Sequence, residues 1–93
     1  MKKASPEELT AMESFAANVQ RLRRKLGLTQ EQFADAVGFS PRYISRLESG
    51  EVDATLRTIA RVAAKLEVPA AALLKVSRLP DAKPGRPRTR RAP

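Results

Sequence analysis

Four polar side chains near the middle of the chain could together recognise a ligand. Arg42, Ser45, Arg46 and Ser49 follow one another at spacings of three, one and three residues, so on an α-helix they form one stripe with two arginines and no acid. A planar guanidinium can donate two parallel hydrogen bonds, and guanine presents a matching pair of acceptors in the major groove of DNA. The stripe therefore predicts contact with base edges, the alternative being a solvated helix face.

The amino-acid composition excludes most other chemistry. The 93 residues include no histidine and no cysteine, which excludes a disulfide, a Cys/His zinc site, a thiol nucleophile and a Ser-His-Asp triad. The sequence also has no glycine-rich phosphate loop and no carboxylate pair in a plausible pocket. We therefore expect no bound metal, no cofactor and no enzymatic activity.

The charge of the chain favours an anionic partner. Lys and Arg total 18 against 10 Asp and Glu, a net charge of +8, which indicates nucleic acid first and an anionic membrane surface second. The longest apolar run, residues 69–74, is far shorter than the ~18 residues that span a bilayer, and the first residues lack the apolar stretch of a secretory signal. We expect a soluble, cytoplasmic, nucleoid-associated protein without a membrane partner.

Composition also divides the chain into three parts. Residues 80–93 hold four of the seven prolines, five basic residues and one acidic residue, with no large apolar side chain, and predict a disordered basic tail. We expect residues 1–4 to be flexible and residues 5–79 to form one domain. The tail residues expected to contact DNA are Lys83, Arg86, Arg88, Arg90 and Arg91.

Capping residues and apolar spacing predict the helices that must position the polar stripe. Ser5, Thr29, Ser40 and Thr55 are suitable capping residues, and Pro69 opens a shorter fifth helix. Apolar residues recur at spacings of three and four, and no stretch shows the alternation of a strand. We therefore predict an all-α, five-helix domain. The first three helices are predicted to end at Gly27, Gly38 and Gly50.

Each helix is predicted to bury one apolar stripe. Leu9 and Met12, at the start of the first stripe, can extend beyond the core and are candidate contacts for a partner. The core residues expected in the five helices are Phe15, Val19, Leu22 and Leu26; Phe33, Ala34 and Val37; Ile44 and Leu47; Leu56, Ile59, Ala60, Ala63 and Leu66; and Leu73, Leu74 and Val76.

The second and third predicted helices form a pair. Each has about eight residues, too few to be stable alone in water, and only residues 38–40 separate them. Two short helices joined by a glycine-containing turn are a helix-turn-helix, whose second helix enters the major groove. The free backbone N–H groups at the two helix starts, next to Thr29 and Ser40, are suited to phosphates.

Three segments of this region, Leu28–Ala34, Val37–Ser40 and Tyr43–Gly50, together resemble the Cro/repressor-type helix-turn-helix family, also called XRE-like. The resemblance extends over about residues 15–74 and implies a DNA-binding regulator. The Tyr-Ile-Ser-x-x-Glu segment that starts at Tyr43 is similar to stand-alone controllers of restriction–modification operons. The Thr-Leu-x-Thr segment that starts at Thr55 is similar to helix-turn-helix antitoxins.

The resemblance implies roles for individual residues. Gln30 would contact phosphate and brace the start of the third helix, and Arg23 and Glu48 would form an ion pair between the first helix and the end of the third. Tyr43 and Ser49 would reach phosphates, with half-buried packing as the alternative for Tyr43. The base-reading positions would be Ser40, Pro41, Arg42, Ser45 and Arg46.

Three features depart from the family pattern. Pro41 has no N–H to donate to a base. Residues 53 and 54, Asp-Ala, replace the basic residues or the proline of some relatives, which argues against a DNA contact from that loop. Glu67 stands where the family often has glycine after the fourth helix, and predicts a strained or altered helix end.

Residues 83–88 in the tail resemble an AT-hook, in which a Gly-Arg-Pro centre lies in a narrow minor groove. Pro84 occupies the position before this centre, where hooks usually have arginine. A plain basic tail that attracts phosphates is the alternative.

These observations leave three functions open. The first is a sequence-specific transcriptional repressor that binds double-stranded DNA as a homodimer on an inverted-repeat operator. The second is an antitoxin that binds a toxin protein and regulates its own operon, and the third is a non-specific architectural DNA-binding protein. The dimer surface is expected to include Val68, Leu73, Leu74 and Val76, or alternatively Leu9 and Met12.

Overall fold

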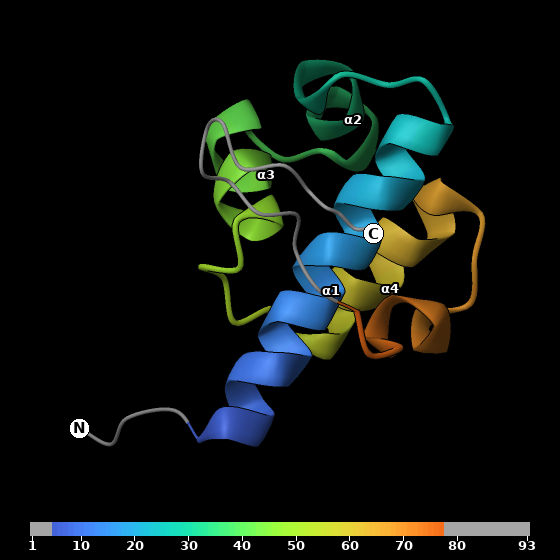
Figure 1. Cartoon of the computed structure of the whole chain (residues 1–93). Helices are drawn as coiled ribbons and strands as arrows, with labels where there is room; N and C mark the ends of the chain where they lie inside the picture. Colours follow the sequence, from blue (N-terminus) through green and yellow to red (C-terminus); the bar gives the residue numbers. More distant parts are fainter. Residues whose placement is uncertain (1–4, 78–93) are drawn as a thin grey trace, which may run out of the picture.

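The structure is a computed structural model that describes residues 5–77 of the chain. Within this part all regular elements are helices: α1 (Pro6–Lys25), α2 (Gln30–Val37), α3 (Pro41–Glu48), α4 (Leu56–Leu66) and the 3-10 helix η1 (Ala70–Leu74) (Figure 1). The all-α prediction is therefore confirmed. The predicted flexible N-terminus (1–4), the end of the predicted domain (78–79) and the predicted basic tail (80–93) lie outside the described residues.

The helices begin at the predicted capping residues. The Ser5 hydroxyl accepts a hydrogen bond from the Glu8 N–H at 3.1 Å, and the Glu8 carboxylate accepts one from the Ser5 N–H at 2.8 Å. The same reciprocal box, at 3.0 and 2.9 Å, joins Thr29 and Gln32 at the start of α2. Each box pairs N–H groups that the helix itself leaves without a partner. Single side-chain caps begin α3 and α4, at Ser40 and Thr55.

Left-handed residues end the helices. Gly27, Gly38 and Gly50 follow α1, α2 and α3 with φ angles of 77°, 84° and 84°, a region that glycine enters without a steric penalty. The α4 helix ends instead on Glu67, whose φ angle is 63°. A residue with a Cβ atom is sterically strained in this conformation. The left-handed φ angle of Glu67 therefore agrees with the strained helix end predicted from the sequence.

The core lies between α1 and the other helices. In Figure 1, α1 runs through the middle of the molecule, with α3 on one side and α4 and η1 on the other. Both short helices of the helix-turn-helix, which would not be stable alone, are supported by longer ones: α3 packs against α1, and α2 packs against α3 and α4. The buried apolar cluster draws on all five elements and consists of Phe15, Val19, Phe33, Ala34, Val37, Ile44, Leu47, Ile59, Val62, Ala63, Leu66 and Leu73.

Several predicted core residues lie on the surface instead. In α4, Val62 is fully buried, whereas Leu56 is 81% exposed and Ala60 is also exposed. The buried stripe of α4 is centred between Val62 and Ala63, which turns Ala60 outward and leaves Leu56 uncovered in the first turn. Three further predicted core residues near the ends of the described helices are also exposed, and these are Leu26, Leu74 and Val76. Leu9, which was expected to extend beyond the core, is 54% exposed.

The fifth predicted helix is a 3-10 helix and not an α-helix, and it ends earlier than predicted. Among residues 5–77 no side chain caps its start, and the chain that follows is bound to α1. Asn18 Nδ2 donates hydrogen bonds to the carbonyls of Leu73, at 3.0 Å, and Lys75, at 2.8 Å. The Ser77 N–H donates to Ser14 Oγ at 3.0 Å. These bonds fix the residues after η1 in a non-helical conformation, so the helix does not continue through them.

Candidate nucleic-acid interface

The α2 helix, the turn and α3 form the predicted helix-turn-helix. On α3, Ile44 and Leu47 are buried, whereas Arg42, Ser45 and Arg46 are exposed. The polar stripe therefore lies on the outer face of α3, from which side chains can reach a groove of DNA. Within the described residues, Arg42 forms no ion pair and its side chain forms no hydrogen bond.

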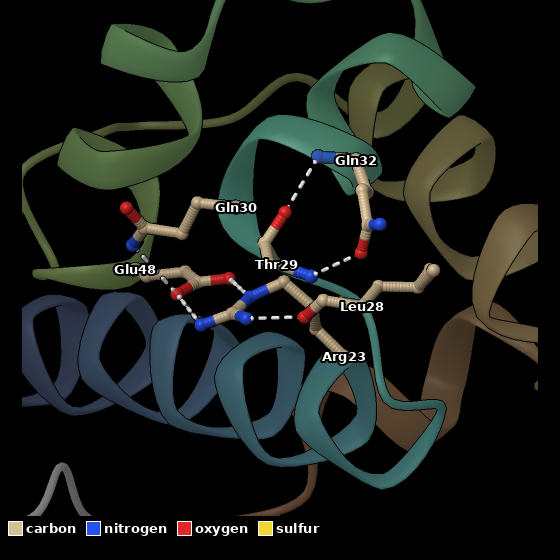
Figure 2. Close-up of polar contacts among 6 residues, drawn as sticks. All are labelled: Arg23, Leu28, Thr29, Gln30, Gln32 and Glu48. Atoms are coloured by element: carbon tan, nitrogen blue, oxygen red, sulfur yellow. Dashed lines mark hydrogen bonds and ion pairs between the residues drawn. The ribbon is translucent and has the colours of Figure 1, made fainter.

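A buried ion pair joins α1 to the end of α3 (Figure 2). Arg23 Nε lies 2.6 Å from Glu48 Oε2, and Arg23 Nη2 donates to Glu48 Oε1 at 2.9 Å. Arg23 Nη1 also donates to the Leu28 carbonyl at 2.6 Å. The two charged side chains are only 7% and 1% exposed. The predicted ion pair is present, and its hydrogen bonds offset the cost of burying both charges.

Gln30, the first residue of α2, belongs to the same network. Its Nε2 donates to Glu48 Oε1 at 3.0 Å (Figure 2). The predicted brace to the start of α3 is therefore wrong: Gln30 contacts the end of α3, where an ionised carboxylate is a strong acceptor. The amide nitrogen carries a second N–H, which can serve a phosphate oxygen.

An aromatic pair packs the turn between α2 and α3. The rings of Phe39 and Tyr43 meet edge to face with their centroids 4.8 Å apart. The guanidinium of Arg61, on α4, lies over the Phe39 ring, 5.2 Å from its centroid. This distance is typical of a cation–π contact. Tyr43 is half-buried, so its packing is observed while its phosphate contact stays a prediction. Sequence reasoning missed Arg61, because spacing along α4 does not show which ring it covers.

An acidic residue lies at the edge of the polar stripe. Glu51 Oε1 is 3.6 Å from Arg46 Nε, and Glu51 Oε2 accepts a hydrogen bond from Ser49 Oγ at 2.8 Å. This contact was not predicted from the sequence, because Glu51 lies beyond the end of α3 and so falls outside the helical spacing that defined the stripe. Ser49, predicted to reach a phosphate, therefore lies beside a carboxylate in this structure.

The remaining predicted contacts lie at helix starts. The hydroxyls of Thr29 and Ser40 accept hydrogen bonds from their own helices, and both residues are exposed. Pro41, also exposed, is the first residue of α3. Among residues 5–77, no group of acidic side chains is arranged to hold a metal ion. In the same part of the chain, no helix is long and apolar enough to cross a bilayer.

Comparison with known sequences identifies the family of this domain. The sequence profile of the HTH_3 helix-turn-helix family matches residues 19–73. An HTH-type transcriptional regulator of Sinorhizobium fredii, y4dJ, is 44% identical over 52 residues, which make up 56% of this chain and 68% of that protein.

Solved structures of regulators share the fold. The hypothetical transcription factor NHTF from Neisseria is 29% identical, with a TM-score of 0.70, and the match covers 82% of this chain and 87% of that chain. The restriction-modification controller protein C.AhdI from Aeromonas hydrophila is 27% identical, with a TM-score of 0.63, and the match covers 67% of this chain and 94% of that chain. The relatives y4dJ and NHTF are transcription regulators and not enzymes. The chain belongs to the HTH_3 helix-turn-helix family and is a DNA-binding transcriptional regulator.

Proposed function

We propose that α3 reads base pairs in the major groove and that the protein represses transcription by occupying an inverted-repeat operator as a homodimer. The observation that carries this proposal is the outward stripe of α3, with exposed Arg42 and Arg46 on a helix anchored by buried Ile44, Leu47 and Glu48. A helix anchored in this way presents its outer side chains in one orientation, which recognition of a sequence requires.

Within this proposal the residues of the interface have two roles. Arg42 and Arg46 pair with guanine, while Ser40 and Ser45 contact neighbouring base edges. Pro41 adds contact area but no hydrogen bond, since it has no N–H. The residues assigned to phosphates are Thr29, Gln30, Tyr43 and Ser49.

A dimer follows from the small size of one recognition helix. One α3 covers about 4–6 base pairs, whereas two copies related by a two-fold axis read half-sites about one helical turn apart. The candidate interface lies after α4, where Leu74 is 46% exposed, Val76 is 83% exposed and Val68 is half-buried. Leu73, predicted for the same surface, is fully buried and cannot contribute. The first turns of α1, which project from the body of the domain in Figure 1, are the alternative interface.

A toxin partner is the second candidate function. Leu56, within the segment that resembles antitoxins, is 81% exposed at the start of α4 and is available to another protein. Single exposed leucines are common on protein surfaces, so the repressor is proposed first. A stable protein that copurifies with the chain and is released by Leu56→Glu, while DNA binding persists, would favour the antitoxin.

Selection of bound duplexes from a random DNA pool tests the proposed function. We expect the full chain to enrich an inverted repeat with half-sites centred about 10 base pairs apart, or a multiple of that spacing. Sedimentation of the complex should show two chains per duplex. A pool without any enriched sequence would contradict base reading and favour an architectural protein, and one chain per footprint would contradict the dimer.

A further inference from the structure

We propose that Glu51 is a positioning residue that orients Arg46 for base reading and thereby raises the selectivity of the protein for its operator over other DNA. Glu51 follows the end of α3 and contacts two residues of the polar stripe, Arg46 and Ser49. The proposal rests on the proposed reading of bases by α3, and it concerns how that reading becomes selective.

The contact between Glu51 and Arg46 leaves the outer donors of the arginine available. The ion pair is made through Nε, the guanidinium nitrogen closest to the aliphatic chain, at 3.6 Å. Nη1 and Nη2 can therefore still donate together to O6 and N7 of a guanine. Glu51 also contacts Ser49 through its second carboxylate oxygen. The single hydroxyl hydrogen of Ser49 is shared between Glu51 Oε2, at 2.8 Å, and the Arg46 carbonyl, at 2.9 Å.

This contact acts differently on operator and on other DNA. The Arg46 side chain is 55% exposed, and ordering an exposed arginine on binding costs entropy. A neighbour that already orients the guanidinium reduces that cost, but only where the orientation meets a guanine. On DNA without a guanine at that position, Arg46 must leave Glu51 to reach a phosphate. The released carboxylate of Glu51 then repels the DNA backbone. Both effects increase the difference between the two affinities, which is selectivity.

Asp53 provides a matched control in the same loop. Like Glu51 it is exposed, and within the described residues its side chain forms neither an ion pair nor a hydrogen bond. Asp53→Asn and Glu51→Gln each remove one negative charge with little change in shape. Only Glu51→Gln also removes an ion pair to Arg46, so the comparison separates positioning from a general charge effect.

The experiment measures the affinity of the full chain for a duplex selected from a random pool and for the unselected pool, at one salt concentration. We expect Glu51→Gln to lower the ratio of the two affinities about two- to five-fold, in line with the energy of an exposed ion pair. Asp53→Asn should leave the ratio unchanged. In an Arg46→Ala background, Glu51→Gln should no longer change the ratio.

The proposal is overturned if Glu51→Gln changes the ratio no more than Asp53→Asn does, or if its effect persists in the absence of Arg46. These outcomes leave base reading by α3 intact, because Arg46→Ala would still lower the ratio. If Arg46→Ala itself leaves the ratio unchanged, base reading by Arg46 and positioning by Glu51 both fail.

Discussion

Arg23 on α1 and Glu48 on α3, 25 residues apart in sequence, form a buried bidentate ion pair with N–O distances of 2.6 and 2.9 Å. Gln30 on α2 donates to the same carboxylate, so one acidic side chain connects three helices. If one partner of this buried pair is removed, the remaining charge is poorly solvated, because little water reaches it. The pair therefore fixes the end of α3 against the other two helices, and the outer face of α3 depends on it.

Glu48→Ala should lower the free energy of unfolding by about 3 kcal/mol, because it leaves the Arg23 guanidinium buried without its counter-charge. Urea denaturation followed by circular dichroism measures the loss. The double variant Arg23→Met/Glu48→Leu should lose less than the sum of the two single variants, since it leaves no buried charge. A loss below about 0.5 kcal/mol for Glu48→Ala, the size of an ordinary surface effect, would be incompatible with a buried pair.

Asn18→Ala should lower the free energy of unfolding by about 1–3 kcal/mol. Asn18 is 2% exposed, and its loss leaves the carbonyls of Leu73 and Lys75 without their donor. Gln20→Ala is a suitable control, because Gln20 is half-buried on the same helix and its side chain forms no hydrogen bond within the described residues. If both variants unfold at the same urea concentration, Asn18 does not hold the segment after η1.

Glu67→Gly should raise the free energy of unfolding by about 0.5–1 kcal/mol. A left-handed residue with a Cβ atom carries a strain of about 1–2 kcal/mol, and the greater freedom of glycine in the unfolded chain cancels part of the gain. Glu67→Ala keeps the Cβ atom and the φ angle of 63°, so it should bring no such gain. Thermal unfolding of the two variants side by side tests the strain, which is absent if they melt together.

Deletion of residues 80–93 tests the predicted tail contacts with DNA. Each phosphate contact contributes about −0.9 to the slope of log K against log salt concentration, so removing five basic residues should make the slope several units shallower. The order of preferred operators should stay the same, because the proposed base contacts are made by α3 and not by the tail. Fluorescence anisotropy over a salt series measures both quantities, and an unchanged slope would point to a protein partner for the tail.

Arg86→Ala separates a minor-groove hook from a plain basic tail within the same assay. An AT-hook predicts a larger loss of affinity when A·T tracts flank the operator than when G·C tracts do, because narrow minor grooves attract arginine. Equal losses on the two flanks would reject the hook and keep the electrostatic tail.

The parts of the fold that could be predicted from the sequence are those with local causes. Thr29 and Gln32 are three residues apart, and their capping box forms without help from another element. The turn after α2 requires a left-handed residue, and Gly38 adopts this conformation with a φ angle of 84°. The ion pair of Arg23 and Glu48 was expected from the family resemblance, together with the position of Glu48 as the lone acid at the end of a basic helix.

The errors concern contacts between distant segments. Asn18 lies among apolar residues of α1, and nothing near it in sequence indicates a bond to Leu73, 55 residues away. Leu56 fits the apolar spacing of α4, but its burial depends on another element covering the first turn, and its 81% exposure shows that no element within residues 5–77 does so. Glu51 and Arg61 were missed for a related reason, because their partners are fixed by the path of a loop and by helix packing.

Base reading by α3 is tested most directly by the affinity of Arg46→Ala for a selected operator and for unselected DNA, measured side by side at one salt concentration. The loss of a bidentate pair with guanine should cost about 1–3 kcal/mol on the operator and relax the preference at one base pair, with a smaller loss on unselected DNA. Arg57→Ala, which removes an exposed arginine of α4 outside the stripe, should leave the preference unchanged. An equal loss of affinity by Arg46→Ala on both kinds of DNA would contradict base reading and assign Arg46 to the phosphates.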